Sequence, residues 1–176
     1  SHRILGISFA GPYIFKKELI DFFDGNLINS HGAPLPDYKG GGGMSWRILQ
    51  RDRRGASLMH LVTSQIDEGP IVFRKNFKFS SRARFPIDYE KRQLTEDKKS
   101  LIPWLKKIIA FKKNIEPLKI FFHNSTPGSY YPRLMTEIHG KINWNDNVRD
   151  IELFICAFSR PYSGASSYLN DSQINI

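Results

Sequence analysis

The strongest constraint on the fold is a change of hydrophobic periodicity near the start of the chain. Residues 3–10 (RILGISFA) form a short apolar run followed by Gly11-Pro12, which is typical of a buried strand. Residues 14–23 (IFKKELIDFF) then carry apolar side chains at helical spacing, and Gly25 supplies a stop. A buried strand followed by an amphipathic helix indicates a β-α unit and an α/β fold.

The rest of the chain continues this alternation. We expect three further strands and a helix, over residues 25–31, 56–63 and 70–79 and over residues 43–50. Residues 80–99 are polar and charged, so they are predicted to form a surface excursion that leads into a helix over residues 101–113.

A last helix is expected after residues 145–147, which offer asparagine and aspartate caps, and it should end near Pro161 and Gly164. Cys156 lies on this helix, where we interpret it as a small structural residue, packed or half exposed, rather than a nucleophile, because no strand-turn-helix elbow presents it. The final residues, 166–176, are expected to begin one more strand.

Composition limits the partners of the protein more than it limits the fold. The formal net charge of +9 favours an anionic partner, which could be nucleic acid, a nucleotide-linked small molecule or a polyglutamylated cofactor. Cys156 is the only cysteine, so an intrachain disulfide and a cysteine-rich zinc site are excluded. The single cysteine fits a reducing cytoplasmic location. No apolar run approaches the roughly 20 residues that a membrane helix needs, so we expect no membrane partner.

Two polar sets stand where strands are predicted to end. Asn29 and His31 are two residues apart, so in a strand they point to the same side, and a loop with two prolines and four consecutive glycines follows them. Asp67 follows the strand over residues 56–63 and precedes Gly69-Pro70. An amide donor, an imidazole and a carboxylate together suit acyl-type transfer to an amine, although each set alone also fits ordinary turn chemistry.

The order of these motifs resembles the formyltetrahydrofolate-dependent formyltransferase family. The family's Asn-x-His, Leu-Pro and aromatic-basic-Gly elements match Asn29-x-His31, Leu35-Pro36 and Tyr38-Lys39-Gly40. Its His, then Asp seven residues later, then Gly, match His60, Asp67 and Gly69. One departure is Gly32-Ala33, where family members often have Pro-Ser after the catalytic histidine.

The resemblance implies a Rossmann-like catalytic domain and assigns roles to particular residues. Asn29 would hydrogen-bond the formyl oxygen, His31 would stabilise the oxyanion or take the proton of the amine, and Asp67 would orient or relay to that imidazole. N10-formyltetrahydrofolate would be the formyl donor, no metal would be required, and His60 would have a supporting role. The folate pocket would include Phe9, Ala10, Gly11, Pro12, Tyr13, Ile66 and Asp67.

Within this family the acceptor amine is the open question. Glycinamide ribonucleotide transformylases lack a tail like residues 142–165, whereas methionyl-tRNA and sugar formyltransferases share it. The His-Gly-Ala-Pro-Leu-Pro loop is closer to that of the sugar enzymes, so the preferred acceptor is a nucleotide-linked amino sugar, with tRNA as the alternative.

The chain also starts where family members have already completed a β-α-β half of the sheet. We therefore expect residues 1–125 to be a partial formyltransferase catalytic domain and residues 126–176 to be a C-terminal extension. A truncated, non-catalytic remnant that acts as a binding or assembly module, with its exposed sheet edge paired to another chain, stays an alternative. A homodimer also stays open. The intact mass of the native product would separate a working enzyme from a remnant.

Two structural expectations follow from the resemblance. The strands that end at Ala10, His31 and Thr63 should be adjacent, with their carboxyl ends in one cleft. Asn29, His31 and Asp67 should converge around a point where a formyl carbon fits.

Overall fold

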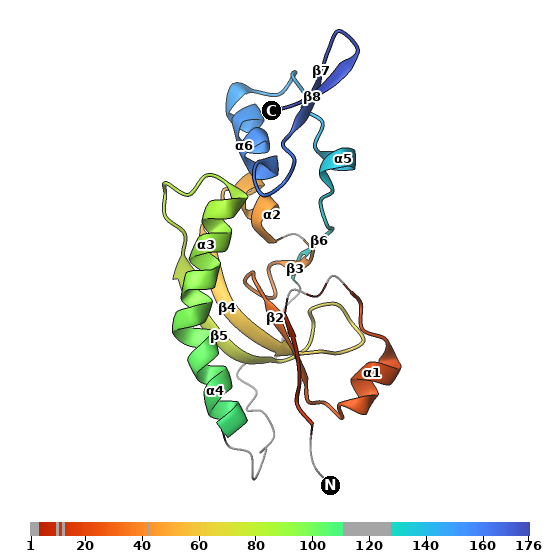
Figure 1. Cartoon of the computed structure of the whole chain (residues 1–176), viewed down its shortest axis with the longest axis vertical. Helices are drawn as coiled ribbons and strands as arrows, with labels where there is room; N and C mark the ends of the chain where they lie inside the picture. Colours follow the sequence, from red (N-terminus) through yellow and green to blue (C-terminus); the bar gives the residue numbers. More distant parts are fainter. Residues whose placement is uncertain (1–3, 10, 12, 42, 111–127) are drawn as a thin grey trace.

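The computed structural model describes residues 4–9, 11, 13–41, 43–110 and 128–176. Its centre is a mixed four-stranded sheet in the order β1-β2-β4-β5 (Figure 1). The strands are β1 (Gly6–Phe9), β2 (Leu27–His31), β4 (Arg54–Leu61) and β5 (Ile71–Lys78). β1 and β2 are parallel and are joined through α1 (Lys17–Phe22), whereas β4 is antiparallel to both β2 and β5. The expected α/β fold and its first β-α unit are confirmed.

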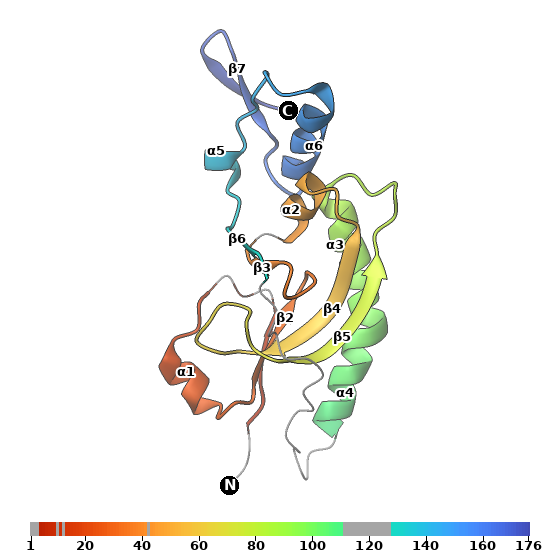
Figure 2. The same ribbon diagram turned by 180° about the vertical axis from the view of Figure 1, so that it is seen from behind.

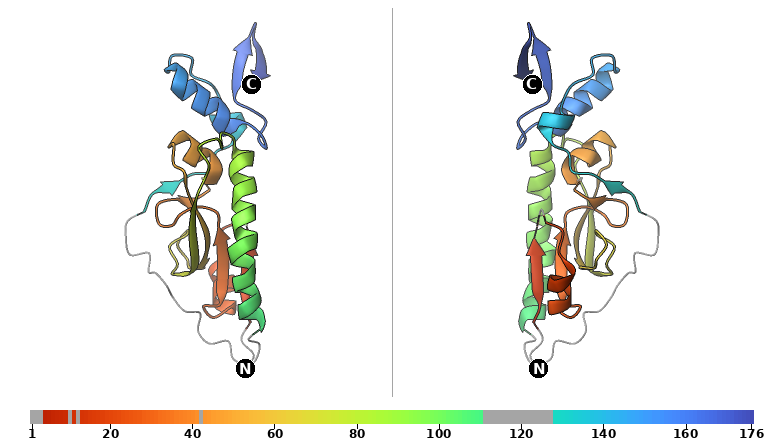
Figure 3. Two further views of the ribbon diagram at one scale, coloured as in Figure 1. Left: turned by 90° about the vertical axis from the view of Figure 1, so that its left-hand side faces the viewer. Right: turned by 90° about the vertical axis from the view of Figure 1, so that its right-hand side faces the viewer.

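One face of this sheet is covered by a long helical rod. The rod consists of α3 (Pro86–Glu96), a turn of π-helix (Asp97–Leu101) and α4 (Ile102–Ala110). Figure 3 shows it standing along one side of the strands. Fully buried Ile28 and Met59 pack against Leu101 of the rod, so alternate residues of β2 and β4 point toward it.

The expectation of a surface excursion over residues 80–99 was wrong from Pro86 onward. The buried residues of α3 are Pro86, Tyr89 and Gln93, which recur at helical spacing. The core-facing Gln93 is polar, and its amide donates to the carbonyl of Ala56. Because a hydrogen-bonded glutamine takes the place of an apolar residue and charged residues fill the other faces, the hydrophobic period of this helix is hidden in the sequence.

The glycine run serves a close contact between backbones. β3 (Lys39–Gly40) pairs in parallel with β6 (Tyr130–Tyr131), which comes from far along the chain. Gly40 has a φ of +87°, and a Cβ there would lie 2.6 Å from the carbonyl oxygen of Tyr131. Only glycine therefore fits this crossing without strain. The short helix α2 (Gly43–Leu49) follows directly, as expected.

The last part of the chain packs on α2 and extends away from the sheet (Figure 2). It contains α5 (Thr136–His139), α6 (Val148–Phe158) and a hairpin of β7 (Ser166–Leu169) and β8 (Ser172–Asn175). Asn147 caps α6, as expected, by accepting from the N–H of Asp150, and Cys156 is packed in the interior rather than half exposed. The expected single strand near the end is a two-stranded hairpin.

The core beneath α6 combines residues from distant parts of the chain. Ile48 and Phe79 share one buried cluster with Phe158 and Ala165. Residues on both sides of the proposed boundary at 125/126 therefore share a core, and the division into two units stays a prediction. Across the described residues, no helix is both long enough and apolar enough to span a bilayer.

Candidate active site

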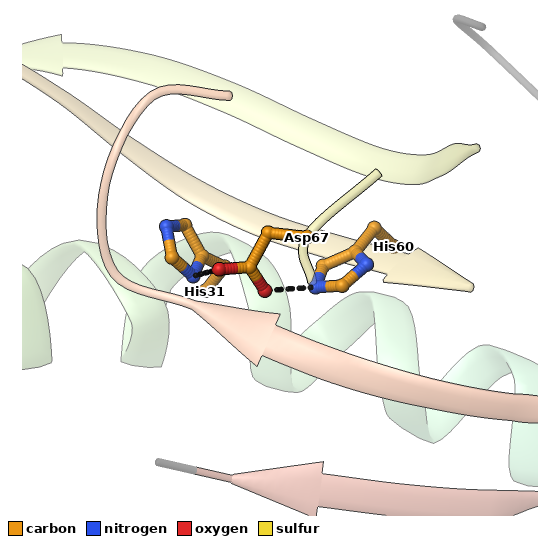
Figure 4. Close-up of side chains that lie close together, drawn as sticks. All are labelled: His31, His60 and Asp67. Carbon is orange, nitrogen blue, oxygen red and sulfur yellow. Dashed lines mark ion pairs between the residues drawn. The ribbon is translucent and has the colours of Figure 1, made fainter. Parts of the chain in front are cut away.

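Asn29 and His31 lie on the sheet face opposite the helical rod. Ile28 precedes Asn29 on β2 and packs toward α4. Because successive side chains of a strand point to opposite faces, Asn29 and His31 point away from the rod. His60 joins them because it is the register partner of Asn29 on β4. Figure 4 shows His31 and His60 on either side of Asp67, with the rod behind the strands.

The expectation that three strands open into one cleft with their carboxyl ends was wrong for β4. The strands are adjacent, but β4 is antiparallel to β2, so Leu61 at its end lies beside Ile28 rather than beside His31. The connection between β2 and β4 contains a helix and is long enough for either direction, so the sequence alone does not reveal it.

The loop between β4 and β5 brings Asp67 to the site instead. Asp67 has a φ of 54°, which turns the chain back over the sheet. Gly69 allows this return, because a Cβ on it would lie 1.8 Å from the carbonyl oxygen of Leu61. The loop therefore places the Asp67 carboxylate next to His31, at the end of β2, and next to His60, near the end of β4.

The predicted residues come together as a compact cluster. Asp67 Oδ2 lies 3.5 Å from His31 Nδ1, and Asp67 Oδ1 lies 3.3 Å from His60 Nε2. Asn29 Nδ2 lies 3.3 Å from the same His60 nitrogen. The N–H of Gly40 donates to Asp67 Oδ2 at 2.7 Å, which fixes the carboxylate from the glycine loop. His60 is thus the link between Asn29 and Asp67.

Backbone carbonyls fix the tautomer of each histidine. His31 Nε2 lies 2.7 Å from the carbonyl oxygen of Tyr38, and His60 Nδ1 lies 2.9 Å from that of Leu61. A carbonyl oxygen only accepts, so these two ring nitrogens carry the protons that they donate. In the neutral rings, His31 Nδ1 and His60 Nε2 therefore keep their lone pairs, and both face Asp67.

The surroundings favour a neutral His31 next to a charged Asp67. Burial lowers the pKa of His31 from its ordinary 6.5; Asp67 opposes this, while His60 and the cation of Arg47 lower the pKa further. Burial by itself would raise the pKa of Asp67. A hydrogen bond from His60 Nε2, which exists only when that ring is protonated, the charge of a protonated His31 and the Gly40 N–H outweigh it, so the pKa of Asp67 lies below 3.8.

Arg47, on α2, is a buried cation whose charge acts on His31. Its guanidinium is fully buried, donates to the carbonyl oxygens of Gly43 and Arg54, and lies 4.8 Å from the centre of the Phe79 ring. Burial lowers its pKa to about 10. This cation ties the end of the glycine run to the start of β4.

A cleft of about 540 Å³ opens over the cluster. Of the expected folate-pocket residues, Gly11, Tyr13, Ile66 and Asp67 line it. Phe9 is half exposed and does not line it, while Ala10 and Pro12 lie outside the described residues.

Sequence reasoning missed one wall of the cleft. Tyr130 and Arg133 line it, and among the described residues Arg133 is its only lysine or arginine. They arrive through the β3–β6 pairing, which joins segments about 90 residues apart and leaves no local signal. The site thus offers a fixed amide, a base with an oriented lone pair, a carboxylate and one cation around an open space.

Comparison with known proteins agrees with this geometry. A family profile for formyl transferases matches residues 12–103. The bifunctional polymyxin resistance protein ArnA of Wigglesworthia glossinidia brevipalpis is 28% identical over an alignment of 172 residues, and the match covers 96% of this chain and 25% of that protein. The chain thus spans about a quarter of the length of this curated relative.

Two solved structures share the fold. The N-formyltransferase from Helicobacter canadensis, in complex with folinic acid and dTDP-3-aminofucose, has a TM-score of 0.73 and 23% identity. The match covers 99% of this chain and 61% of that one. Methionyl-tRNA formyltransferase from Clostridium thermocellum has a TM-score of 0.65 and 17% identity, over 96% of this chain and 74% of that one. Since the family profile covers just over half of the sequence, the chain belongs to the formyl transferase family.

Proposed function

We propose that the protein transfers a formyl group from N10-formyltetrahydrofolate to the amine of a nucleotide-linked amino sugar. The observation that carries this proposal is the His31 imidazole, whose Nε2–H is held by the Tyr38 carbonyl so that the Nδ1 lone pair faces Asp67 at the cleft. A neutral base held in one tautomer beside a carboxylate is what deprotonation of an attacking amine requires.

The proposed reaction assigns a step to each side chain. The Asn29 amide donates to the formyl oxygen while the amine nitrogen attacks the formyl carbon, and a tetrahedral oxyanion forms. His31 Nδ1 takes the proton that the amine loses, and Asp67 stabilises the imidazolium. The bond from the formyl carbon to N10 of the folate then breaks, and N10 receives that proton. His60 acts as a positioning residue, because it contacts Asn29 and Asp67 and is anchored to Leu61.

The cleft supports the folate assignment in part. Gly11, Tyr13 and Ile66 line the cleft, and main-chain groups there could hydrogen-bond the edge of a pterin ring. The Helicobacter protein was solved with folinic acid, a formyl-bearing folate. We place the folate beside these residues and the acceptor toward Tyr130 and Arg133, which belong to the proposed C-terminal extension, residues 126–176.

The distribution of charge favours a sugar nucleotide over tRNA as acceptor. A tRNA acceptor requires many cations around the cleft, whereas a diphosphate needs only two or three. Within the described chain, the cations of residues 90–93 and 96–99 lie on the helical rod, on the sheet face away from His31, and residues 111–114 lie outside the described residues. Among the described residues that line the cleft, Arg133 is the one lysine or arginine, which is far fewer cations than tRNA requires and supplies one of those that a diphosphate needs.

An assay with defined acceptors tests the proposal. The protein is incubated with N10-formyltetrahydrofolate and a panel of dTDP- and UDP-linked amino sugars, and the products are analysed by mass spectrometry. We expect one acceptor to gain a formyl group, and the same sugar without its nucleotide to react poorly. Formylation of methionyl-tRNA with no sugar product would contradict the assignment of the acceptor.

A further inference from the structure

The atoms of the proposed site also form a set of metal ligands. Among the described residues, His31, His60 and Asp67 each offer one ligand atom, and these atoms all lie within 4.8 Å of one another. Figure 4 shows the carboxylate between the two rings. Two imidazoles and one carboxylate are a donor set that suits zinc and neighbouring first-row divalent ions better than magnesium or calcium.

The tautomers make this set more than a coincidence of residue types. Metal-binding histidines usually donate their other ring N–H to a carbonyl or carboxylate, which orients the ring. Both rings here do so, His31 to Tyr38 and His60 to Leu61. The Gly40 N–H in turn holds the carboxylate of Asp67. The second layer of a metal site is therefore already in place around three ligand atoms.

The separations between these atoms also suit a metal. Ligands about 2.1 Å from a tetrahedral zinc ion are roughly 3.4 Å apart. His31 Nδ1 lies 3.5 Å from Asp67 Oδ2 and His60 Nε2 lies 3.3 Å from Asp67 Oδ1, while the set with one atom from each residue spans up to 4.8 Å, so binding draws the ligands slightly closer together. In the neutral rings, His31 Nδ1 and His60 Nε2 present lone pairs toward the carboxylate, and a metal at His60 Nε2 takes the place of the 3.3 Å contact with Asn29 Nδ2.

We propose that His31 Nδ1, His60 Nε2 and Asp67 bind a divalent first-row metal ion such as Zn²⁺, with its fourth coordination position open to the cleft. The ion binds the lone pair of His31 Nδ1, which would otherwise accept the proton of the amine. It also binds Asp67, which would otherwise stabilise the imidazolium. Metal binding therefore inhibits formyl transfer and does not assist it; this consequence, unlike the binding itself, rests on the proposed function.

Cobalt provides a direct test of binding, because its visible absorption reports coordination geometry. Tag-free, chelator-treated protein is titrated with Co²⁺. We expect saturable absorption bands of a four- or five-coordinate site at micromolar metal, and their loss on adding one equivalent of Zn²⁺, which binds more tightly. Absence of these bands at saturating cobalt overturns the proposal.

Matched variants locate the ion. His60→Gln and Asp67→Asn should each weaken cobalt binding at least tenfold, whereas His139→Ala, at an exposed histidine on α5, should leave it unchanged. Thermal unfolding followed by circular dichroism checks that each variant is folded. Full-strength bands in a folded His60→Gln variant would place the ion elsewhere and refute the site.

Inhibition is measured separately. Micromolar Zn²⁺ should abolish formyl transfer, and EDTA should restore it. Zinc bound at these residues without loss of activity would contradict the proposed catalytic role of His31 while leaving the metal site intact. Conversely, absence of metal binding in a protein that transfers formyl groups would refute the metal site and leave the proposed function intact.

Discussion

His31 illustrates how a single side chain acquires a defined role from its surroundings. Its ring is held by the Tyr38 carbonyl, and burial lowers its pKa below 6.5. At neutral pH it is therefore a neutral base with one oriented lone pair. Asp67 opposes the effect of burial by favouring the imidazolium, so the two residues set the proton affinity of the site together.

The pH dependence of activity follows from these directions. Because the folded-state pKa of His31 lies below 6.5, kcat/KM of chelator-treated protein should be constant at neutral pH and fall only below pH 6.5. Asp67→Asn removes the group that raises this pKa, so the acidic limb should move to still lower pH in addition to the loss of rate. Asp171→Asn, at an exposed turn, is the control. A limb that stays in place in Asp67→Asn would contradict the coupling.

The same shifts have a consequence for stability. The unfolded state binds a proton at His31 more readily than the folded state, so the free energy of unfolding should decrease as pH falls below 6.5. Asp67 adds stability above pH 3.8 that is lost as pH falls further. The free energy of unfolding, measured with urea, should have nearly the same pH slope in the wild type and in His31→Asn above pH 7. Below pH 6.5 the wild type should show the steeper loss of stability with falling pH. Equal slopes below pH 6.5 would show that His31 does not contribute.

Among the secondary-structure elements, local patterns predicted the type of most strands and helices but not their directions. The strand over residues 25–31, the helix α2 and the capped helix α6 all carry clear local signals and were found. The antiparallel direction of β4 depends on the whole sheet, and the helical rod hides its period behind Gln93. The two-residue spacing of Asn29 and His31 predicts that they share one face of a strand. No local pattern predicts that Tyr130 and Arg133 line the same cleft.

The loop that carries Asp67 depends on Gly69. A Cβ at this position would lie 1.8 Å from the carbonyl oxygen of Leu61, so the loop has to shift. Gly69→Ala should lower the free energy of unfolding by about 2 kcal/mol and displace Asp67. Gly32→Ala, where a Cβ meets nothing within 4 Å, is the matched control. Urea unfolding measures both, and equal stability of the two variants would argue against this close contact.

Arg47 connects α2, the glycine run and β4. Arg47→Ala should lower the free energy of unfolding by about 3 kcal/mol, because it leaves a cavity and two carbonyls without their donor. Arg47→Met keeps most of the volume and should cost less. Arg149→Ala, on the exposed side of α6, should have little effect. Chemical unfolding compares the three, and a neutral Arg47→Ala would show that the buried cation is dispensable.

At the scale of the whole molecule, the cleft exists because distant segments meet. The β3–β6 pairing brings Tyr130 and Arg133 next to strands that lie much earlier in the sequence. The net charge of +9 is not concentrated there, since the described cations of α3 and of the π-helical turn lie on the other face of the sheet. The overall charge therefore says less about the acceptor than the single cation in the cleft does.

Arg133 should contribute to binding of the acceptor. Arg133→Ala should raise the KM for a nucleotide-linked sugar about tenfold, as expected for loss of one charge-assisted contact to a phosphate, while kcat changes little. Arg149→Ala serves as the control for a general change of charge. Steady-state kinetics separate the two parameters. A fall in kcat with unchanged KM would instead place Arg133 in the chemical step.

The central claim is that this site transfers a formyl group with Asn29 as the donor to the developing oxyanion. The most direct measurement is single-turnover transfer from N10-formyltetrahydrofolate to the amino-sugar nucleotide, compared among wild type, Asn29→Ala and Asn175→Ala, the last an exposed position on β8. We expect Asn29→Ala to be at least about a hundredfold slower, with folate binding retained, and Asn175→Ala to match the wild type. Undiminished transfer by Asn29→Ala would contradict the account.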